Sequence, residues 1–178
     1  MGAANPKRGE WPADGALSGS ASNGPIVGNR QRVYLLPGQL HASAEPCQIK
    51  TILGSCVSIC LWDKRRSTGA MNHFLLPVSR EGQPASLRFA DVATNVLLEQ
   101  LHRLGCRPPN LRAKLFGGAA LFQMRDRYAA SLGAHNVDAA LRLMKSAGIP
   151  VIAQETGGAQ GRKVIFNTDD GVAWSQRI

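Results

Sequence analysis

The segment Ile49–Trp62, which reads IKTILGSCVSICLW, decides how this chain folds. Aliphatic and β-branched residues fill both halves of it, and the pair Gly54-Ser55 interrupts them in the middle. Short apolar runs bounded by a turn signal are typical of buried strands, but a strand that continues into a helix gives the same pattern. We therefore expect either two short strands joined by a bend or a strand that enters a helix through the bend. In both cases Cys56 directly follows the bend.

Outward from this segment, short apolar runs mix with two helical patterns. The clearest helix covers residues 89–104, where apolar residues recur at helical spacing and Gly105 stands at the position of a C-cap. A second amphipathic pattern covers residues 136–147. Strands are expected at residues 33–36, 70–77, 111–116, 151–154 and 163–167. Because strands and helices do not alternate strictly, the sequence predicts the α+β class, a layered α/β sandwich of mixed β-sheets packed with helices.

The length of 178 residues suits one domain with a tail. Residues 1–30 are rich in Gly, Ala, Ser, Asn and Pro, and they show neither the period of a strand nor that of a helix. This composition predicts a disordered, basic and glycine-rich tail over residues 1–30. A single domain is expected over residues 33–178.

Composition disfavours several classes of protein. No apolar run approaches the ~20 residues that span a bilayer, and no apolar stretch of signal-peptide length stands at the N-terminus. We therefore expect a cytoplasmic protein without membrane insertion, whose four cysteines are free thiols. The net charge of +9 favours acidic partners. Because the basic residues are scattered and no nucleic-acid-binding motif is present, we expect an acidic protein partner rather than nucleic acid.

Cys56 is the first candidate for chemistry. A small-residue bend before a thiol lets the backbone turn sharply, and amide N–H groups at such a bend can donate to a developing oxyanion. If a helix began at the bend, its N-terminus would lower the pKa of the thiol. The local sequence leaves a second interpretation open, a small buried hydrophobe, because free cysteine is among the most buried residue types.

His73 is the only ionisable residue in the apolar run over residues 70–77. A lone histidine on a buried strand is often a hydrogen-bonded core residue, because a polar ring there is costly without a partner. A histidine beside a cysteine, however, accepts the thiol proton and stabilises the thiolate as an ion pair. The connection from Cys56 to His73 suits two neighbouring strands joined by a turn at residues 64–69.

A metal site is the alternative use of these side chains. Cys56 and Cys60 form a CxxxC pair that Cys47, His41 and His73 could complete. The residues between the two cysteines do not form the tight knuckle usual for structural zinc, and no second matching pair is present. We therefore expect no metal and no other cofactor.

Two glycine pairs, Gly117-Gly118 and Gly157-Gly158, follow strand candidates. They are either turns that need a positive φ or places where an extended substrate approaches the backbone closely. Neither has the pattern of a phosphate-binding loop. Asn72 and Asn136 either orient a histidine, contact an amide substrate, or make ordinary strand and turn hydrogen bonds.

Four motifs, in one order over most of the chain, resemble a single family. They are residues 53–63 (LGSCVSICLWD), residues 69–77 (GAMNHFLLP), residues 113–119 (AKLFGGA), and residues 155–158 (ETGG) followed by residues 161–166 (GRKVIF). On these motifs the chain, from about residue 33 almost to its end, resembles the CheD family, the chemoreceptor glutamine deamidases of bacterial chemotaxis.

The resemblance implies a cysteine-dependent deamidase whose fold is similar to that of the glutamine-deamidating cytotoxic necrotizing toxins. The family's catalytic cysteine and histidine match Cys56 and His73. Its catalytic threonine has its nearest match in Thr51, although the segment before the cysteine is one residue shorter here. The family usually has a basic residue at the position of His135.

The resemblance also implies a substrate and partners. Family members convert glutamines of methyl-accepting chemoreceptors to glutamate, and some bind the phosphatase CheC. We expect the Cys56 thiolate to attack the glutamine amide, His73 to transfer the proton and Thr51 to orient His73. Substrate contacts are expected from residues near this group, namely Ser55, Asn72, Gly117 and Gly118.

Two other functions fit the same residues. A binding module that regulates a chemotaxis phosphatase or receptor without chemistry would suit the basic surface and the departure at His135. Another thiol enzyme, such as a transglutaminase or an amidase, would share the thioester step. It would differ in whether an amine or water resolves the thioester.

Overall fold

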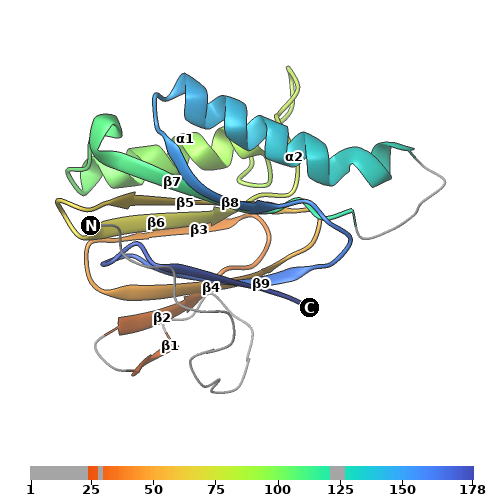
Figure 1. Cartoon of the computed structure of the whole chain (residues 1–178). Helices are drawn as coiled ribbons and strands as arrows, with labels where there is room; N and C mark the ends of the chain where they lie inside the picture. The colour runs from red at the N-terminus through yellow and green to blue at the C-terminus, as the bar shows by residue number, and fades with distance from the viewer. Residues whose placement is uncertain (1–23, 28–29, 121–126) are drawn as a thin grey trace.

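The computed structural model describes residues 24–27, 30–120 and 127–178. These residues form three layers, with two α-helices on one five-stranded sheet and a second five-stranded sheet against its other face (Figure 1). Helix α1 (Ala90–Arg103) packs over β3 and β6, and α2 (Arg127–Ser146) packs over β5, β7 and β8. The layered α+β class predicted from the sequence is confirmed.

The sheet beneath the helices, called the central sheet here, has the strand order β3-β6-β5-β7-β8. Its strands are β3 (Gln39–Ser43), β5 (Val57–Asp63), β6 (Thr68–His73), β7 (Leu111–Gly117) and β8 (Val151–Thr156), and a 3₁₀ turn at Pro108–Asn110 precedes β7. All neighbours are antiparallel except β7 and β8. The central sheet is therefore a mixed sheet with helices on one face.

The second sheet, called the outer sheet, has the order β1-β2-β4-β9-β10. Its strands are β1 (Gly24–Val27), β2 (Arg30–Tyr34), β4 (Cys47–Leu53), β9 (Arg162–Asn167) and β10 (Ala173–Arg177). Only β2 and β4 run parallel. Strand β1 lies within the segment whose composition predicts a tail, and residues 1–23 and 28–29 lie outside the described residues.

Residues 49–53 belong to β4 and residues 57–62 to β5, so the two-strand alternative is correct and the helix alternative is wrong. The bend at Gly54-Ser55 carries the chain from the outer sheet to the central sheet. Almost every side chain of both strands is buried, including polar ones such as Thr51 and Ser58. Because no helix begins at Cys56, no helix N-terminus lowers the pKa of its thiol.

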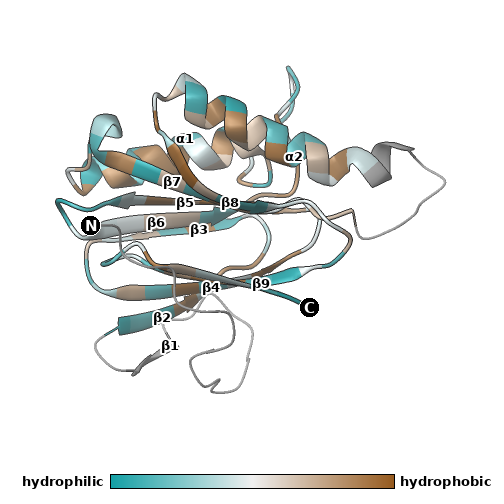
Figure 2. Ribbon diagram, in the orientation of Figure 1, coloured by the Kyte–Doolittle hydropathy of each residue, from teal (hydrophilic) through white to brown (hydrophobic). Residues whose placement is uncertain are grey.

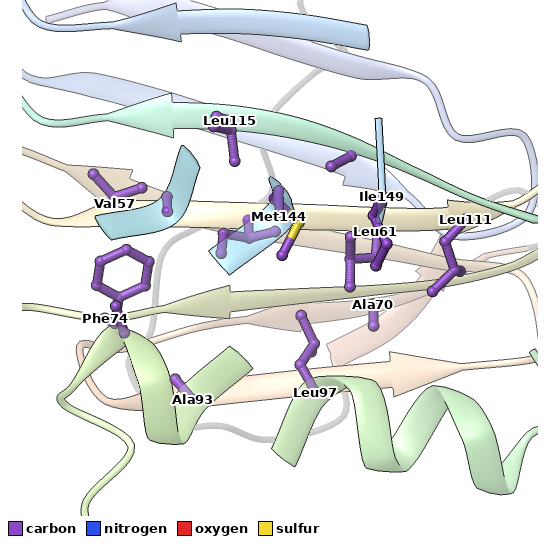
Figure 3. Close-up of a cluster of buried hydrophobic side chains, with 14 of the residues drawn as sticks. Val57, Leu61, Ala70, Phe74, Ala93, Leu97, Leu111, Leu115, Met144 and Ile149 are labelled. Atoms are coloured by element: carbon purple, nitrogen blue, oxygen red, sulfur yellow. The ribbon is translucent and has the colours of Figure 1, made fainter. Parts of the chain in front are cut away.

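Alternate residues of the central sheet enter two different cores. A cluster under the helices contains Val57, Leu61, Phe74 and Leu97 (Figure 3). A second cluster fills the space between the sheets and contains Cys60, Met71 and Phe166. Figure 2 shows hydrophobic colouring along the strands and on parts of both helices, with hydrophilic residues interspersed. Successive side chains of a central strand thus enter opposite cores, as the period of two in a strand requires.

Several element boundaries differ from those predicted. Helix α2 begins at Arg127 rather than at residue 136, and strands β1, β3 and β10 were not predicted. Strands β3 and β10 are rich in polar residues and none of the side chains of β3 is fully buried, so these two sequences carry little apolar periodicity. Within the described residues, no helix is long and apolar enough to cross a membrane.

Candidate functional site

The register of β5 against β6 places Cys56 and His73 on one face of the central sheet. Cys60 opposes Met71, and Val57 opposes Phe74 with both backbone hydrogen bonds formed at 3.0 and 3.1 Å. The same register sets His73 opposite Ser58 and places Cys56 diagonally next to it. Because side chains alternate along a strand, Cys56 and His73 both face the outer sheet.

The outer sheet supplies a hydrogen-bond relay to His73. Thr51, on β4, lies with its Oγ1 2.8 Å from Nδ1 of His73 and donates to the carbonyl oxygen of Leu35 at 2.8 Å. A threonine hydroxyl has one proton and a carbonyl oxygen can only accept, so the hydroxyl proton points to Leu35. Nδ1 must then carry the ring proton and donate to Thr51. Nε2 is therefore the nitrogen with a free lone pair when the ring is neutral.

Burial keeps the His73 ring neutral. The side chain is 2% exposed, and this burial lowers its pKa to about 4, against a smaller opposing effect of the Leu35 backbone. Nε2 is buried and has no hydrogen-bond partner among the described residues. The ring is thus available as a base at neutral pH.

The Cys56 thiol is half-buried, and burial raises its pKa, while a hydrogen bond from its own backbone N–H acts in the opposite direction. Since Nε2 of His73 is unpartnered, the thiol and the imidazole are not hydrogen-bonded in this structure. The sequence predicted a stabilised thiolate. The directions of both pKa shifts favour a neutral thiol beside a neutral imidazole instead, because burial disfavours both charged forms.

The loop after β7 supports the bend at residues 54–56, called the cysteine bend here. The backbone N–H of Gly118 donates to Cys56 O at 2.8 Å, and that of Ala119 donates to Gly54 O at 2.8 Å. Gly117 has a φ of +107°, and a Cβ there would lie 2.2 Å from Cys56 O. Only glycine therefore allows the loop to approach the cysteine so closely. The structure brings both predicted glycines to Cys56.

Asn136 connects helix α2 to the same bend. Its Nδ2 donates to Ser55 O at 2.9 Å and to Leu75 O at 2.8 Å, and the side chain is fully buried. The helix comes this close because Gly118 and Gly133 face each other. A Cβ at Gly133 would lie 2.5 Å from Gly118 O.

The second glycine pair lies beside the first. Gly157 N donates to Gly117 O at 2.9 Å, and Ala120 N donates to Gly158 O at 2.8 Å. Arg162 is only 4% exposed, and its guanidinium donates to the backbone carbonyls of residues 155 and 157. Two turns that are far apart in the sequence thus form one continuous support behind the cysteine bend.

Asn72 is not brought to the thiol. It opposes Ile59 in the register extended from β5 and β6, and its Oδ1 accepts from Ile59 N at 2.8 Å. The side chain is fully buried on the helix-facing side, because it alternates with His73. His135 lies exposed on α2.

Sequence reasoning missed two contributors to the site. The Leu35 carbonyl, which accepts the hydrogen bond from Thr51 Oγ1, is a backbone group, so no residue type in the sequence indicates it. Ser58 is fully buried opposite His73, and its Oγ has no hydrogen-bond partner among the described residues. The sequence did indicate Ser58, since it is a polar residue between apolar residues of a strand.

The cysteines do not gather around a metal. All four are unpaired, and no group of three or more His, Cys, Asp or Glu side chains within the described residues is placed to hold a metal ion. Cys60 lies within β5 and enters the core between the sheets, whereas Cys56 lies in the bend directly before β5.

Comparison with known proteins agrees with the motifs. A family model described as CheD, chemotactic sensory transduction, matches residues 75–177. The protein of Anaeromyxobacter dehalogenans named "Probable chemoreceptor glutamine deamidase CheD 1" is 47% identical over 159 residues, which are 89% of this chain and 92% of the relative. The CheD proteins of Trichlorobacter lovleyi and Rhodospirillum rubrum, which carry the same name without a number, are 42% and 40% identical over 142 and 146 residues.

These alignments cover 80% and 82% of this chain and 88% and 82% of the two relatives. The matches therefore extend well beyond the segments around Cys56 and His73, and they include the support built by β7, α2 and β8. The resemblance stated from the sequence is confirmed, and the chain belongs to the CheD family of chemotactic sensory-transduction proteins.

Proposed function

We propose that this chain is a protein-glutamine deamidase that converts glutamine side chains of methyl-accepting chemoreceptors to glutamate in chemotaxis. The names of its relatives support the substrate and the reaction. The single observation that supports the chemistry most directly is the relay from His73 through Thr51 to Leu35. This relay leaves Nε2 as the free base on the sheet face that carries Cys56.

In the first half of the proposed reaction, the Cys56 sulfur attacks the side-chain amide carbon while Nε2 of His73 takes the thiol proton. The oxyanion that forms faces backbone N–H groups at the bend, and each such donor typically contributes about 3 kcal/mol. The imidazolium then gives its proton to the amide nitrogen. The C–N bond breaks, ammonia leaves, and a thioester on Cys56 remains.

In the second half, His73 takes a proton from water as the water oxygen attacks the thioester carbon. The C–S bond breaks, the proton passes from the imidazolium to the sulfur, and the product is glutamate. The Nδ1–H of His73 donates a hydrogen bond to Thr51 Oγ1 throughout, which orients the ring and stabilises its charged form. The product carries a negative charge that the substrate lacks, which would alter receptor signalling electrostatically.

The proposal needs no metal or other cofactor, because the thiol and the imidazole supply the nucleophile and the base. It includes a cytoplasmic location for the protein. A CheC-type phosphatase is part of the proposal as a partner. Of the expected substrate contacts, Ser55, Gly117 and Gly118 adjoin Cys56, whereas Asn72 faces the helices.

The test is mass spectrometry of a purified cytoplasmic receptor fragment incubated with the protein. The unaltered protein should convert specific glutamines to glutamate, with oxygen incorporated from isotopically labelled water, and Cys56→Ala should not. Cys60→Ala is the matched control, because Cys60 is a buried free thiol four residues further on that faces the same core between the sheets.

Equal conversion by the unaltered protein and by Cys56→Ala would contradict the proposal. Receptor binding without conversion by either protein would favour the non-catalytic regulator instead. Incorporation of a labelled amine in place of water would show a transglutaminase.

A further inference from the structure

We propose that Asn136 is a positioning residue that aims the backbone N–H of Cys56 at the reacting carbonyl, an inference that rests on the proposed deamidation. Asn136 itself touches no substrate in this arrangement. It acts from the helix layer through a peptide bond of the cysteine bend. Neither the family motifs nor the catalytic group of Cys56, His73 and Thr51 includes this role.

The first step is that one amide holds both strands of the site. The two N–H groups of the Asn136 side chain donate to Ser55 O at 2.9 Å and to Leu75 O at 2.8 Å. Ser55 directly precedes Cys56, and Leu75 opposes Cys56 in the β5–β6 register. The amide therefore ties the segment that carries the thiol to the segment that carries His73.

The second step follows from the planarity of the peptide bond. The Ser55–Cys56 peptide is trans, so its C=O and its N–H point in opposite directions. Asn136 reaches the Ser55 carbonyl from α2, the layer that covers the helix-facing side of the central sheet. The Cys56 N–H must therefore point away from α2, toward the space between the sheets.

The third step is that the thiol lies on this same side. Cys56 packs against the core between the sheets, whereas the next residue, Val57, packs under the helices. The Cys56 N–H lies close enough to its own thiol to lower the thiol pKa, which opposes the larger effect of burial. An N–H beside the attacking sulfur is where an oxyanion donor is required.

The fourth step is that the neighbouring peptides are already fixed. The backbone N–H of Ala119 donates to Gly54 O, and that of Gly118 donates to Cys56 O, each at 2.8 Å. The Ser55 carbonyl is the one between them, and Asn136 holds it. Removal of the Asn136 amide frees the carbonyls of Ser55 and Leu75, while the peptides on either side of Ser55–Cys56 stay held. The effect on the orientation of the Cys56 N–H should therefore exceed the effect on the fold.

The test measures deamidation of the receptor fragment by Asn136→Ala and Asn136→Asp. Both should lower kcat by about 100-fold or more while KM stays within about threefold, as for the loss of an oxyanion donor. Asn136→Asp should regain part of its kcat as the pH falls from about 8 to about 6, because a protonated carboxyl recovers one donor.

A second measurement, the rate at which iodoacetamide alkylates Cys56, needs no receptor. Both variants should react roughly tenfold more slowly, because the thiolate loses a donor. The matched control is Thr168→Val. Thr168 is likewise a fully buried polar residue that holds backbone groups, at Glu45 and Cys47, but it lies away from the bend. This control should lose stability and keep both rates.

An unchanged alkylation rate and an unchanged kcat in both Asn136 variants would overturn the inference. So would a fall in kcat that merely follows the folded fraction and shows no recovery of Asn136→Asp in acid. If the unaltered protein does not deamidate the receptor fragment but alkylation still depends on Asn136, the proposed function fails and the positioning role stands.

Discussion

The two faces of strand β5 differ in kind although they consist of alternate residues of one short segment. On the helix-facing side, Val57, Ile59 and Leu61 are fully buried and wholly apolar. On the side that faces the outer sheet stand Cys56 and Ser58, next to His73 of β6. One face therefore contributes mainly stability, and the other holds the reactive groups.

Both faces hold buried polar atoms, but their surroundings differ. Ser58 Oγ and His73 Nε2 are buried without a hydrogen-bond partner among the described residues on the side of Cys56, and Asn72 Nδ2 and Thr94 Oγ1 are in the same state under the helices. A buried unpaired polar atom costs about 1–3 kcal/mol. The difference teaches that such a cost occurs on both faces, and that only beside Cys56 do the unpaired atoms lie where a substrate would supply the missing partner.

The largest effect that tests this comparison is the replacement of the base. His73→Gln should lower receptor deamidation by about 10³-fold, within the range for loss of a general base. His41 is the matched control, because its Nε2 is also buried and unpartnered, and burial also lowers its pKa. His41→Gln should keep its activity, since no threonine relay to His41 is seen in the described residues. An equal loss in both variants would contradict the assignment of His73.

The next effect tests the opposite face. Leu97→Ala removes a fully buried side chain from the cluster under the helices and should lower the free energy of unfolding by about 2–5 kcal/mol. Urea unfolding measures this change. The kcat of the molecules that remain folded should not change, because the reactive groups lie on the other side of the sheet. A fall in kcat at full folding would show that the two faces are not independent.

The smallest effect concerns the pH dependence of stability. His73 has a folded-state pKa of about 4, below its ordinary value of 6.5, so the unfolded state binds the proton more readily. The stability that depends on neutral His73 is thus complete above pH 6.5 and is lost as the pH falls toward 4. The loss should reach about 2 kcal/mol between pH 7 and pH 5. Urea unfolding of His73→Gln at both pH values should lack this part of the change, and an identical pH dependence in both proteins would contradict the lowered pKa.

Much of the fold and part of the site could be predicted from local patterns. The apolar runs around Gly54-Ser55 predicted buried strands, and helical spacing predicted α1 to within a residue at each end. Cys56 and His73 could be selected because each is a reactive residue in an otherwise apolar run. These features depend on periods of two or 3.6 residues, which the sequence displays directly.

The sequence by itself therefore determined the α+β class, the bend before the thiol and the two residues expected to react. Only the tertiary structure decided how they are held and charged. Thr51 reaches His73 across two sheets and 22 positions of sequence, and Asn136 reaches Ser55 across 81 positions. Burial between the sheets, rather than any neighbour in the chain, sets the neutral state of both groups. Contacts and desolvation of this kind arise only when distant segments pack together, so no local pattern could have encoded them.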